Sequence, residues 1–502
     1  MMPEDKAVEQ LKNSLLHLRE GDTVELKKSS DLPTSFWETY SSFSNTNGGL
    51  IVLGVYEQKE ENEILGVNHP EHILETLWNN FSNPEKVSFR TVNNQDVSTA
   101  VIDDKTVVLV HVNEAPDGKK PVYINGKMEN SYIRTGDGDR RATKDEIAAF
   151  LRNAKPGMDA LAADRCTMED LDDDSILVFK QIVNSRFPKK KYLEMNNLDF
   201  LIEIGGCIKN RATNKIEVLR GTLLFFGKVN SIKEYYPHFH LDYFNRKGNN
   251  PRWIDRVSDD EPGDVEMNLF NFYRIVDEKL KNLLMDSFKL DENQVRVAPS
   301  DFDETIRECL VNCLAHADYA QGYPSLKIEA YDGWFRFFNP GQMLISEEQF
   351  RLGGDSRPRN EIVMKMFRLI GASERQGFGG PLIFKAAQRN DFRQPEVDTN
   401  LEHTEVRVWD IDLADSYPEL TSTEKNALRY ITKGRGETSI KNIKEVTKVN
   451  DYQTRKALKV LEDKNIITKV GNGSSTRYVL KEGSKEFVTQ LQILLDVLKN
   501  RA

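Results

Sequence analysis

The chain has 502 residues, of which 39% are hydrophobic and 29% charged, and this length and composition predict three or four soluble domains. No apolar run approaches the roughly 18 residues needed to span a bilayer, and the polar N-terminal stretch argues against a secretory signal. Four scattered cysteines favour a reducing, cytoplasmic location over a disulfide framework. The net charge of −10 is unevenly spread, because residues 420–502 carry +8 and the remainder carries −18. A basic module therefore follows an acidic body.

Residues 1–154 form the first predicted domain. Helical spacing over residues 7–18 precedes an alternating strand pattern at residues 23–27, and helical spacing returns over residues 37–43. A glycine turn then leads into a buried apolar strand at residues 50–55. Residues 142–151 predict a closing helix, with a capping box formed by Thr143 and Glu146.

Several short motifs follow one another in this domain: Val24-Glu25-Leu26-Lys27, Ser42–Gly49, Leu53-Gly54-Val55 and Tyr132–Gly136. In this order they resemble the AlbA-like domain of the Schlafen family. In its nuclease members, two glutamates and a further acidic residue form a metal-dependent active site on RNA.

The resemblance assigns those roles to Glu20, Glu25 and Glu57, with Lys27 beside them. Three carboxylates can hold Mg²⁺ or Mn²⁺, which activates water, while a lysine meets the phosphate. Tyr56 and Glu57 stand where paired aspartates are more usual in the family. A binding or assembly role without cleavage is the alternative for this domain.

Residues 155–298 are predicted to connect the outer modules, beginning with a Pro-Gly linker. The apolar stretch Gly221–Gly227 predicts a strand bracketed by glycines. His238 and His240 alternate on another predicted strand, so both would face one side and suit a metal. Because no third ligand is evident, a structural role is favoured for them.

The segment Asp303–Gly322 predicts an amphipathic helix with its C-terminal cap near Gly322. Glu308, Asn312 and His316 are spaced four apart, so they project from one side of that helix. A carboxylate, an amide and an imidazole in this arrangement can activate a water and hold Mg²⁺ near a phosphate.

Two of the four cysteines, Cys309 and Cys313, lie one turn apart near His316 and raise the alternative of a zinc site. Helix cysteines are usually buried small hydrophobes, so packing is the preferred interpretation.

Two glycine motifs follow this helix, at Asn339-Pro340-Gly341 and at residues 374–380. A polar helix followed by two glycine turns resembles the nucleotide pocket of the GHKL ATPases, most closely a divergent branch of bacterial proteins described as ATP-binding or transcriptional regulators. The resemblance makes Glu308 the general base and Asn312 the Mg²⁺ ligand, with His316 and Asp318 completing the motif. Most GHKL proteins have an aspartate under adenine where Asn339 stands, and an asparagine accepts the base's hydrogen bond more weakly.

The other predicted ATP contacts are backbone-accessible glycines and residues of a mobile lid before a helix that begins near residue 361. They are Gly341, Arg357, Arg359, Asn360, Gly377, Gly379 and Gly380.

Residues 415–502 predict three helices, over residues 420–432, 440–446 and 451–464, and then a hairpin over residues 466–480. This is the order of a winged helix-turn-helix, whose third helix enters the major groove. The predicted nucleic-acid contacts are Tyr452, Gln453, Arg455, Lys456 and Lys459 from that helix, with Lys469 and Arg477 from the wing. A protein-binding winged helix is the alternative, and an apolar stripe at residues 486–498 suits packing or a dimer seam.

The sequence therefore predicts a multidomain α+β protein, with an AlbA-like domain (1–154), a connector (155–298), a GHKL-like α/β sandwich (299–412) and a winged helix (415–502). The first hypothesis is a nuclease gated by an ATPase module and suited to bacterial defence or stress. The alternative is an ATP-responsive transcriptional regulator without nuclease activity, and a weaker third is an assembly scaffold. The implied ligands are ATP, Mg²⁺ or Mn²⁺ and DNA or RNA, and the GHKL resemblance implies a homodimer or larger homo-oligomer.

Overall fold

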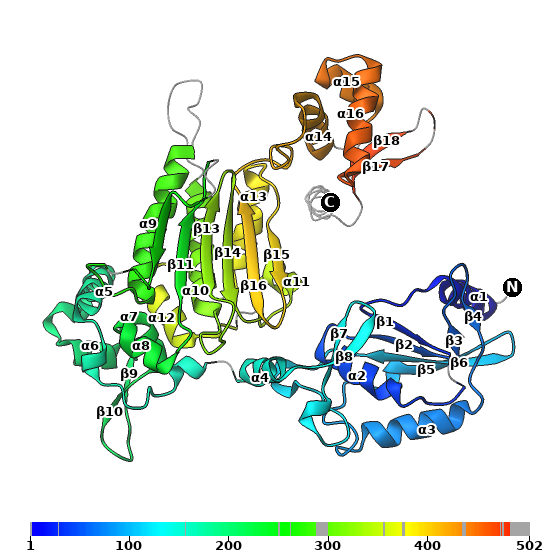
Figure 1. Cartoon of the computed structure of the whole chain (residues 1–502), viewed down its shortest axis with the longest axis horizontal. Helices are drawn as coiled ribbons and strands as arrows, with labels where there is room; N and C mark the ends of the chain where they lie inside the picture. The colour runs from blue at the N-terminus through cyan, green and yellow to red at the C-terminus, as the bar shows by residue number, and fades with distance from the viewer. Residues whose placement is uncertain are drawn as a thin grey trace. The chain divides into compact units, whose positions relative to one another are not determined.

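The structure is a computed structural model, and the chain divides into two compact units, Met1–Pro156 and Gly157–Ala502 (Figure 1). The residues described are 3–28, 30–155, 157–248, 252–261, 263–287, 300–354, 357–373, 377–433, 438–471, 473 and 476–481. The predicted final helix at 486–498 lies outside these residues, as do residues 374–376 of the second glycine motif.

Unit 1 is a small α/β fold around a four-stranded sheet of order β1-β2-β6-β5, with β1 and β2 parallel and the other pairs antiparallel. Its elements are α1 (Pro3–His17), β1 (Val24–Lys27), α2 (Ser35–Asn45), β2 (Gly49–Leu53), β3 (Val55–Tyr56), β4 (Glu63–Ile64), α3 (Pro70–Phe81), β5 (Val97–Ile102), β6 (Lys105–Val112), β7 (Tyr132–Thr135), β8 (Gly138–Arg141) and α4 (Lys144–Asn153).

Helices cover both faces of this sheet, and Figure 1 shows α1 and α3 on opposite sides of it. Leu15 of α1 packs with Leu26 and Val52 on one face, whereas the aromatic residues of α2 and α3 fill the other. The closing helix α4 begins with the predicted capping box: the Thr143 hydroxyl accepts from the Glu146 amide, and the Glu146 carboxylate accepts from the Thr143 amide.

Unit 2 contains a six-stranded sheet with helices before, between and after its strands. The elements up to the sheet are α5 (Asp173–Arg186), α6 (Asn197–Glu203), β9 (Cys207–Lys209), β10 (Ile216–Val218), α7 (Arg220–Phe226) and α8 (Val229–Tyr235). Those of the sheet layer are β11 (Leu241–Asn245), β12 (Asp255–Ser258), α9 (Leu269–Ser287), α10 (Ser300–His316), β13 (Leu326–Tyr331), β14 (Trp334–Pro340), α11 (Glu347–Leu352), α12 (Glu361–Leu369), α13 (Gly379–Arg389), β15 (Glu396–Thr399) and β16 (His403–Trp409).

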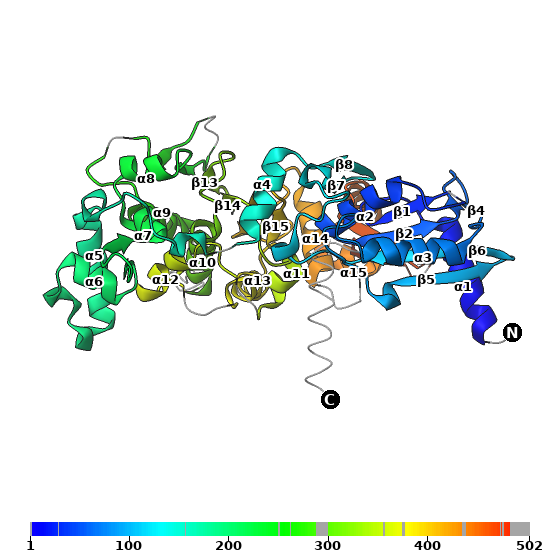
Figure 2. The ribbon, with the colours of Figure 1, turned by 90° about the horizontal axis from the view of Figure 1, so that it is seen from below.

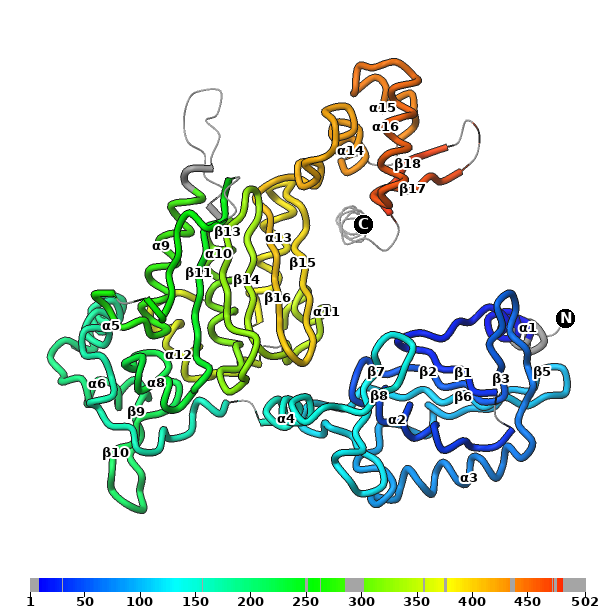
Figure 3. The backbone as a smooth tube through the Cα atoms, viewed as in Figure 1, coloured from blue at the N-terminus to red at the C-terminus, as the bar shows by residue number. Residues whose placement is uncertain are grey.

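The strand order of this sheet is β12-β11-β13-β14-β16-β15, and β11 and β13 run parallel while the other pairs are antiparallel. Between β11 and β13 the chain passes through α9 and α10, as the tube in Figure 3 traces. Helices α10, α12 and α13 lie on one side of the sheet (Figure 2), and they share its main hydrophobic core. Strands β11 and β12 come from the predicted connector, so one sheet contains strands from both sides of the predicted domain boundary at residue 298.

The first residues of unit 2 contact the start of α12 through Asp159. The Asp159 carboxylate, almost completely buried, accepts hydrogen bonds from the amides of Glu361, Ile362 and Val363 at 2.8–3.0 Å. It therefore caps the positive end of that helix, where backbone amides have no intrahelical acceptor.

Three local predictions for unit 2 are wrong. His238 and His240 lie in the turn and loop before β11, so neither is on a strand. The stretch Gly221–Gly227 is largely the buried helix α7, because a short apolar run suits a buried helix as well as a strand. Helix α10 ends at His316, well before Gly322, because side chains from the start of α12 take its last carbonyls: Asn360 donates to those of Ala315 and Ala317.

The chain ends its described part with three helices and a hairpin, in the order predicted: α14 (Ser422–Lys433), α15 (Ile440–Thr447), α16 (Asp451–Asp463), β17 (Ile467–Val470) and β18 (Arg477–Leu480). They enclose a small apolar core of their own that includes Leu428, Ile443 and Leu458.

Candidate functional site

Helix α10 supplies the polar face that the sequence predicts, and the face borders a cavity. Glu308, Asn312 and His316 all line this cavity, and the Asn312 amide nitrogen donates to Glu308 Oε1 at 3.3 Å. The Glu308 side chain is largely buried although it is a carboxylate. A buried carboxylate beside an amide is a costly arrangement that marks a candidate site more often than a packing position.

Glycines of α13 and the turn before it close the opposite wall. A side chain at Gly379 would place its Cβ 2.2 Å from Glu308 Oε1 and 3.0 Å from Asn312 Nδ2, so any other residue there would displace the Glu308 carboxylate. Gly377 has φ +79° and touches Gly354, while a Cβ on Gly380 would overlap the carbonyl of Phe350. The wall facing Glu308 is thus bare backbone, with the amides that start α13.

The sheet forms the floor of the cavity through β14 and β16. Asn339, whose amide nitrogen donates to the Pro340 carbonyl at 3.1 Å, lies on this floor with Thr404. The Thr404 hydroxyl donates to the Gly341 carbonyl at 2.9 Å. Thr404 is a lining residue that the sequence reasoning missed, and its only signal was its place on the strand face that also carries Val406 and Val408.

Apolar side chains complete the cavity and were also missed: Phe337, Met343, Leu344, Ile345, Phe350, Met364, Ile383 and Val406. They come from elements distant in the sequence, so helical or strand periodicity gives no sign that they meet. A mostly apolar lining with a few convergent polar groups is typical of a small-molecule site.

Burial keeps the histidine and the two cysteines of the cavity neutral. It lowers the pKa of His316 to about 4, and the positive charge of Arg359 acts in the same direction. Burial also raises the pKa of the Cys309 and Cys313 thiols well above their usual range. These cysteines pack in the hydrophobic core, and they do not converge with His316 as ligands of one metal in the described part of the chain.

Of the other predicted nucleotide contacts, Arg357 lines the cavity, whereas Asp318, Gly341, Arg359 and Asn360 do not. Arg359 donates to the carbonyls of His316 and Gln342 and is almost fully buried. Arg359 and Asn360 therefore hold the end of α10 in place. Gly341 has φ +90°, and a Cβ added to it would lie 2.8 Å from the Cβ of Asp318. These two residues therefore fix the turn beneath Asn339.

In unit 1, Glu25 is enclosed by positive charge. Its carboxylate pairs with Lys27 Nζ at 2.8 Å and with Arg134 Nη2 at 2.9 Å, and the Arg134 side chain is only 2% exposed. Arg134 also pairs with Asp139 and donates to the carbonyl of Gly21. Arg134 was not predicted as a partner of Glu25, although it is part of the motif at the end of this domain.

Glu20 and Glu57 lie close to this pair, and one oxygen of each accepts a hydrogen bond from the backbone. Glu20 accepts from the Leu26 amide at 3.0 Å, and Glu57 accepts from the Glu20 amide at 3.0 Å. Burial raises the pKa of Glu20, and the charges of Glu25 and Glu57 add to the rise. In the described part of the chain, the oxygens of Glu20, Glu25 and Glu57 do not come close enough together to share one metal ion.

Two of these regions match models of known protein families. Residues 20–143 match the family model described as "Schlafen, AlbA_2". The chain carries a Schlafen AlbA_2 domain. Residues 325–408 match the model "Putative ATP-dependent DNA helicase recG C-terminal", an ATPase-like domain, and residues 148–242 match a domain of unknown function, DUF8451.

Two solved structures are similar to this protein, one over most of the chain and the other over about a quarter of it. The crystal structure of the DIP2311 protein from Corynebacterium diphtheriae has 13% identity over 95% of this chain and 99% of its own, with a TM-score of 0.36. The solution structure of the N-terminal domain of a "Putative ATP-dependent DNA Helicase RecG-related Protein" from Nitrosomonas europaea has 23% identity over 28% of this chain and 95% of its own, with a TM-score of 0.21. No curated protein matches the sequence.

The match in unit 2 covers the sheet floor and the glycine turn but begins after α10. The ATPase-like domain therefore contributes Asn339, Gly379 and Thr404 to the cavity, and α10 adds Glu308 and Asn312 from outside the matched segment. The cavity and the AlbA_2 domain lie in different units of the chain. None of the helices in the described residues is both long and apolar enough to cross a membrane.

The predicted nucleic-acid contacts on α16 share one exposed surface. Tyr452 is 76% exposed, and Gln453, Arg455, Lys456 and Lys459 are exposed with it. Lys469 of β17 is exposed, and Arg477 of β18 is partly buried. Thr454, Ala457, Leu458 and Leu461 face the core, so the helix is oriented with its cationic side toward solvent.

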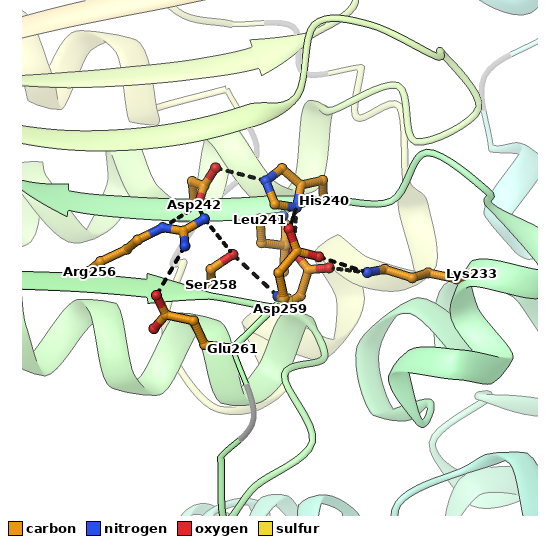
Figure 4. Close-up of polar contacts among 9 residues, drawn as sticks. Lys233, His240, Leu241, Asp242, Arg256, Ser258, Asp259 and Glu261 are labelled. Carbon is orange, nitrogen blue, oxygen red and sulfur yellow. Dashed lines mark hydrogen bonds and ion pairs between the residues drawn. The ribbon is translucent and has the colours of Figure 1, made fainter.

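A second charged cluster surrounds His240, just before β11 (Figure 4). His240 Nε2 lies 2.8 Å from Asp242, and its Nδ1 lies 2.9 Å from Asp259 and 3.4 Å from Asp260. His240, Asp259 and Asp260 are close enough to share an ion, but hydrogen bonds to Asp242 and Asp259 raise the pKa of His240 to about 10. A doubly hydrogen-bonded imidazolium donates through both nitrogens and has no lone pair for a metal, so the structural role predicted for this histidine is favoured.

Proposed function

We propose that this protein binds ATP in the cavity beside α10 and uses nucleotide to control its binding to nucleic acid. The observation that carries the proposal is the convergence of Glu308, Asn312 and His316 with the glycine turn at Gly377–Gly380. Bare backbone amides at the start of a helix suit phosphates, and a buried carboxylate and amide opposite suit hydrolysis. The match of residues 325–408 to an ATP-dependent family supports the same ligand.

The donor set fits Mg²⁺, which prefers hard oxygen ligands and would neutralise charge on the phosphates. Because Asn312 turns its amide nitrogen toward Glu308 Oε1, its carbonyl oxygen is the atom available for a hard cation. Glu308 is the base in this proposal: it takes a proton from the water whose oxygen attacks the terminal phosphorus. The bond from that phosphorus to the bridging oxygen breaks, and its electron pair leaves with ADP.

The adenine end of the ligand belongs against the sheet floor in this proposal. The Asn339 side chain donates its amide to the Pro340 carbonyl, which leaves its oxygen to accept from the adenine amino group. Thr404 lies beside it, and the apolar lining suits the faces of a purine ring. This assignment makes the divergent Asn-Pro-Gly motif compatible with base recognition.

Nucleic acid is the proposed partner of α16 and of the AlbA_2 domain. Helices α14 to α16 with the hairpin are interpreted as a winged helix, with Tyr452, Arg455 and Lys456 on the exposed face that would meet DNA. In the AlbA_2 domain, the two cations on Glu25 favour a binding role over metal-dependent cleavage. A DNA-binding, ATP-responsive regulator is therefore preferred to a nuclease.

The deciding experiment measures Mg-ATP binding by calorimetry for the wild type and Asn312→Ala. We expect the wild type to bind and the variant to lose at least about tenfold in affinity, because a ligand to the cation and a partner of Glu308 are removed together. Asn230→Ala, at an exposed position outside the cavity, should bind like the wild type. Equal affinity for all three proteins would reject this assignment of the site.

A further inference from the structure

A second cavity lies against the same wall of α10 and α13, and it shares Glu308 and Gly379 with the nucleotide cavity. Its other lining residues include Arg307 and Glu304 of α10 and Phe378 and Lys385 from the α13 side. Because Glu308 and Gly379 line both cavities, these two residues form a wall that the cavities share. Glu308 is thus positioned to act on a group at this boundary.

The second cavity carries two cations without ion-pair partners among the described residues. Within the described residues, neither Arg307 nor Lys385 forms a salt bridge, although Asp303 lies close enough to interact with Arg307 electrostatically. Arg307 Nε is buried without a hydrogen-bond partner. By contrast, Arg336 on the sheet is paired with two glutamates at once. Buried guanidinium nitrogens are normally satisfied, so an arginine that lines a cavity while one of its nitrogens lacks a partner suits an anionic ligand.

We propose that this second cavity receives the inorganic phosphate released from ATP, held by Arg307 and Lys385. The inference rests on the proposed ATPase function and deepens it by assigning the path of one product. It also assigns these two residues a role that the nucleotide cavity itself does not require.

The lining of the cavity is mixed in charge. Arg307 and Lys385 are its cations, and the carboxylates of Glu304 and Glu308 lie beside them. The carboxylates oppose an anion, so the cavity suits a phosphate that is held briefly and then leaves.

The experiment measures Mg-ADP binding to the full chain by calorimetry, with and without inorganic phosphate. We expect phosphate to tighten Mg-ADP binding to the wild type by about five- to tenfold, which is an ordinary coupling between two adjacent sites. In Lys385→Gln, and in Arg307→Gln, that coupling should disappear while the affinity for Mg-ADP alone stays within about twofold of wild type. Lys441→Gln, an exposed cation on α15, should keep the coupling.

The outcomes separate the two proposals. If the wild type does not bind Mg-ADP, the proposed function is rejected and the phosphate site with it. If Mg-ADP binds but phosphate has no effect, or has the same effect in the Lys385 and Arg307 variants as in the wild type, the phosphate site alone is rejected. Lys385 is exposed, so its variant tests the idea even if the partly buried Arg307 position does not tolerate glutamine.

Discussion

His240 supplies a prediction about stability that can be worked out from the structure. Its pKa of about 10 in the folded protein is far above the value near 6.5 of an unfolded chain, because Asp242 and Asp259 hydrogen-bond both ring nitrogens. A raised folded-state pKa means that the histidine contributes its full stability below pH 6.5 and loses it as pH rises through 10. The two pKa values differ by an amount equivalent to about 5 kcal/mol, and solvent screening at this partly exposed side chain reduces that to about 2–3 kcal/mol.

The assay is urea unfolding of the wild type and His240→Asn at pH 6, 8 and 10. Because other groups titrate over this range, the informative quantity is the difference in unfolding free energy between the two proteins. We expect a difference of about 2–3 kcal/mol at pH 6 that shrinks toward zero near pH 10. The charges facing the ring, from Lys233, Arg256, Asp260 and Glu261, are unchanged by the substitution.

His238→Asn is the matched control, since this neighbouring histidine is exposed and forms none of the ion pairs of the cluster within the described residues. It should lower the free energy of unfolding by no more than about 0.5 kcal/mol at any of these pH values. A destabilisation by His240→Asn that is the same at pH 6 and pH 10 would contradict the reasoning, because it would show that packing and not charge makes this residue stabilising.

Three further substitutions test other contacts. Asp159→Ala should destabilise unit 2 by about 2–4 kcal/mol in thermal unfolding, because three amides at the start of α12 lose a buried acceptor. A destabilisation below about 0.5 kcal/mol, as at an ordinary surface position, would contradict the capping role. Glu25→Gln should destabilise unit 1 by about 1–2 kcal/mol, since the buried Arg134 loses one of its two carboxylates and keeps Asp139, and unchanged stability would refute this. Gly379→Ala should abolish Mg-ATP binding with little loss of stability, because its Cβ would occupy the space next to Glu308; retained binding would place the nucleotide elsewhere.

The sequence was sufficient to predict the parts of the site that depend on one helix. The period of the α-helix alone places Glu308, Asn312 and His316 on one side, and the structure shows all three at one cavity. The β13–β14 hairpin could be predicted in the same way, because Gly333 supplies the positive φ that a tight turn requires. Such features need no knowledge of what packs against them.

Features that depend on distant packing could not be predicted. Arg359 and Asn360 have the chemistry of phosphate ligands, yet their donors are used by carbonyls at the end of α10. No local pattern shows whether a polar residue before a helix faces a cavity or another helix end. The same limit explains the six-stranded sheet: β11 pairs with β13 across the whole of α9 and α10, so its membership follows from contacts that no short stretch encodes.

Glu25 shows how the same limit affects the assignment of chemistry. A glutamate in a family motif predicts a metal ligand, but whether its oxygens are available depends on Arg134, which comes from β7 far along the chain. With Lys27 on one oxygen and Arg134 on the other, a cation approaching Glu25 would have to displace one of them and meet the positive charge of both. Loss of activity in a Glu25 variant would therefore not by itself identify a nuclease, because the substitution also leaves the buried Arg134 without one of its two carboxylates. Cleavage that disappears while unit 1 keeps its stability is the combination that only a catalytic role explains.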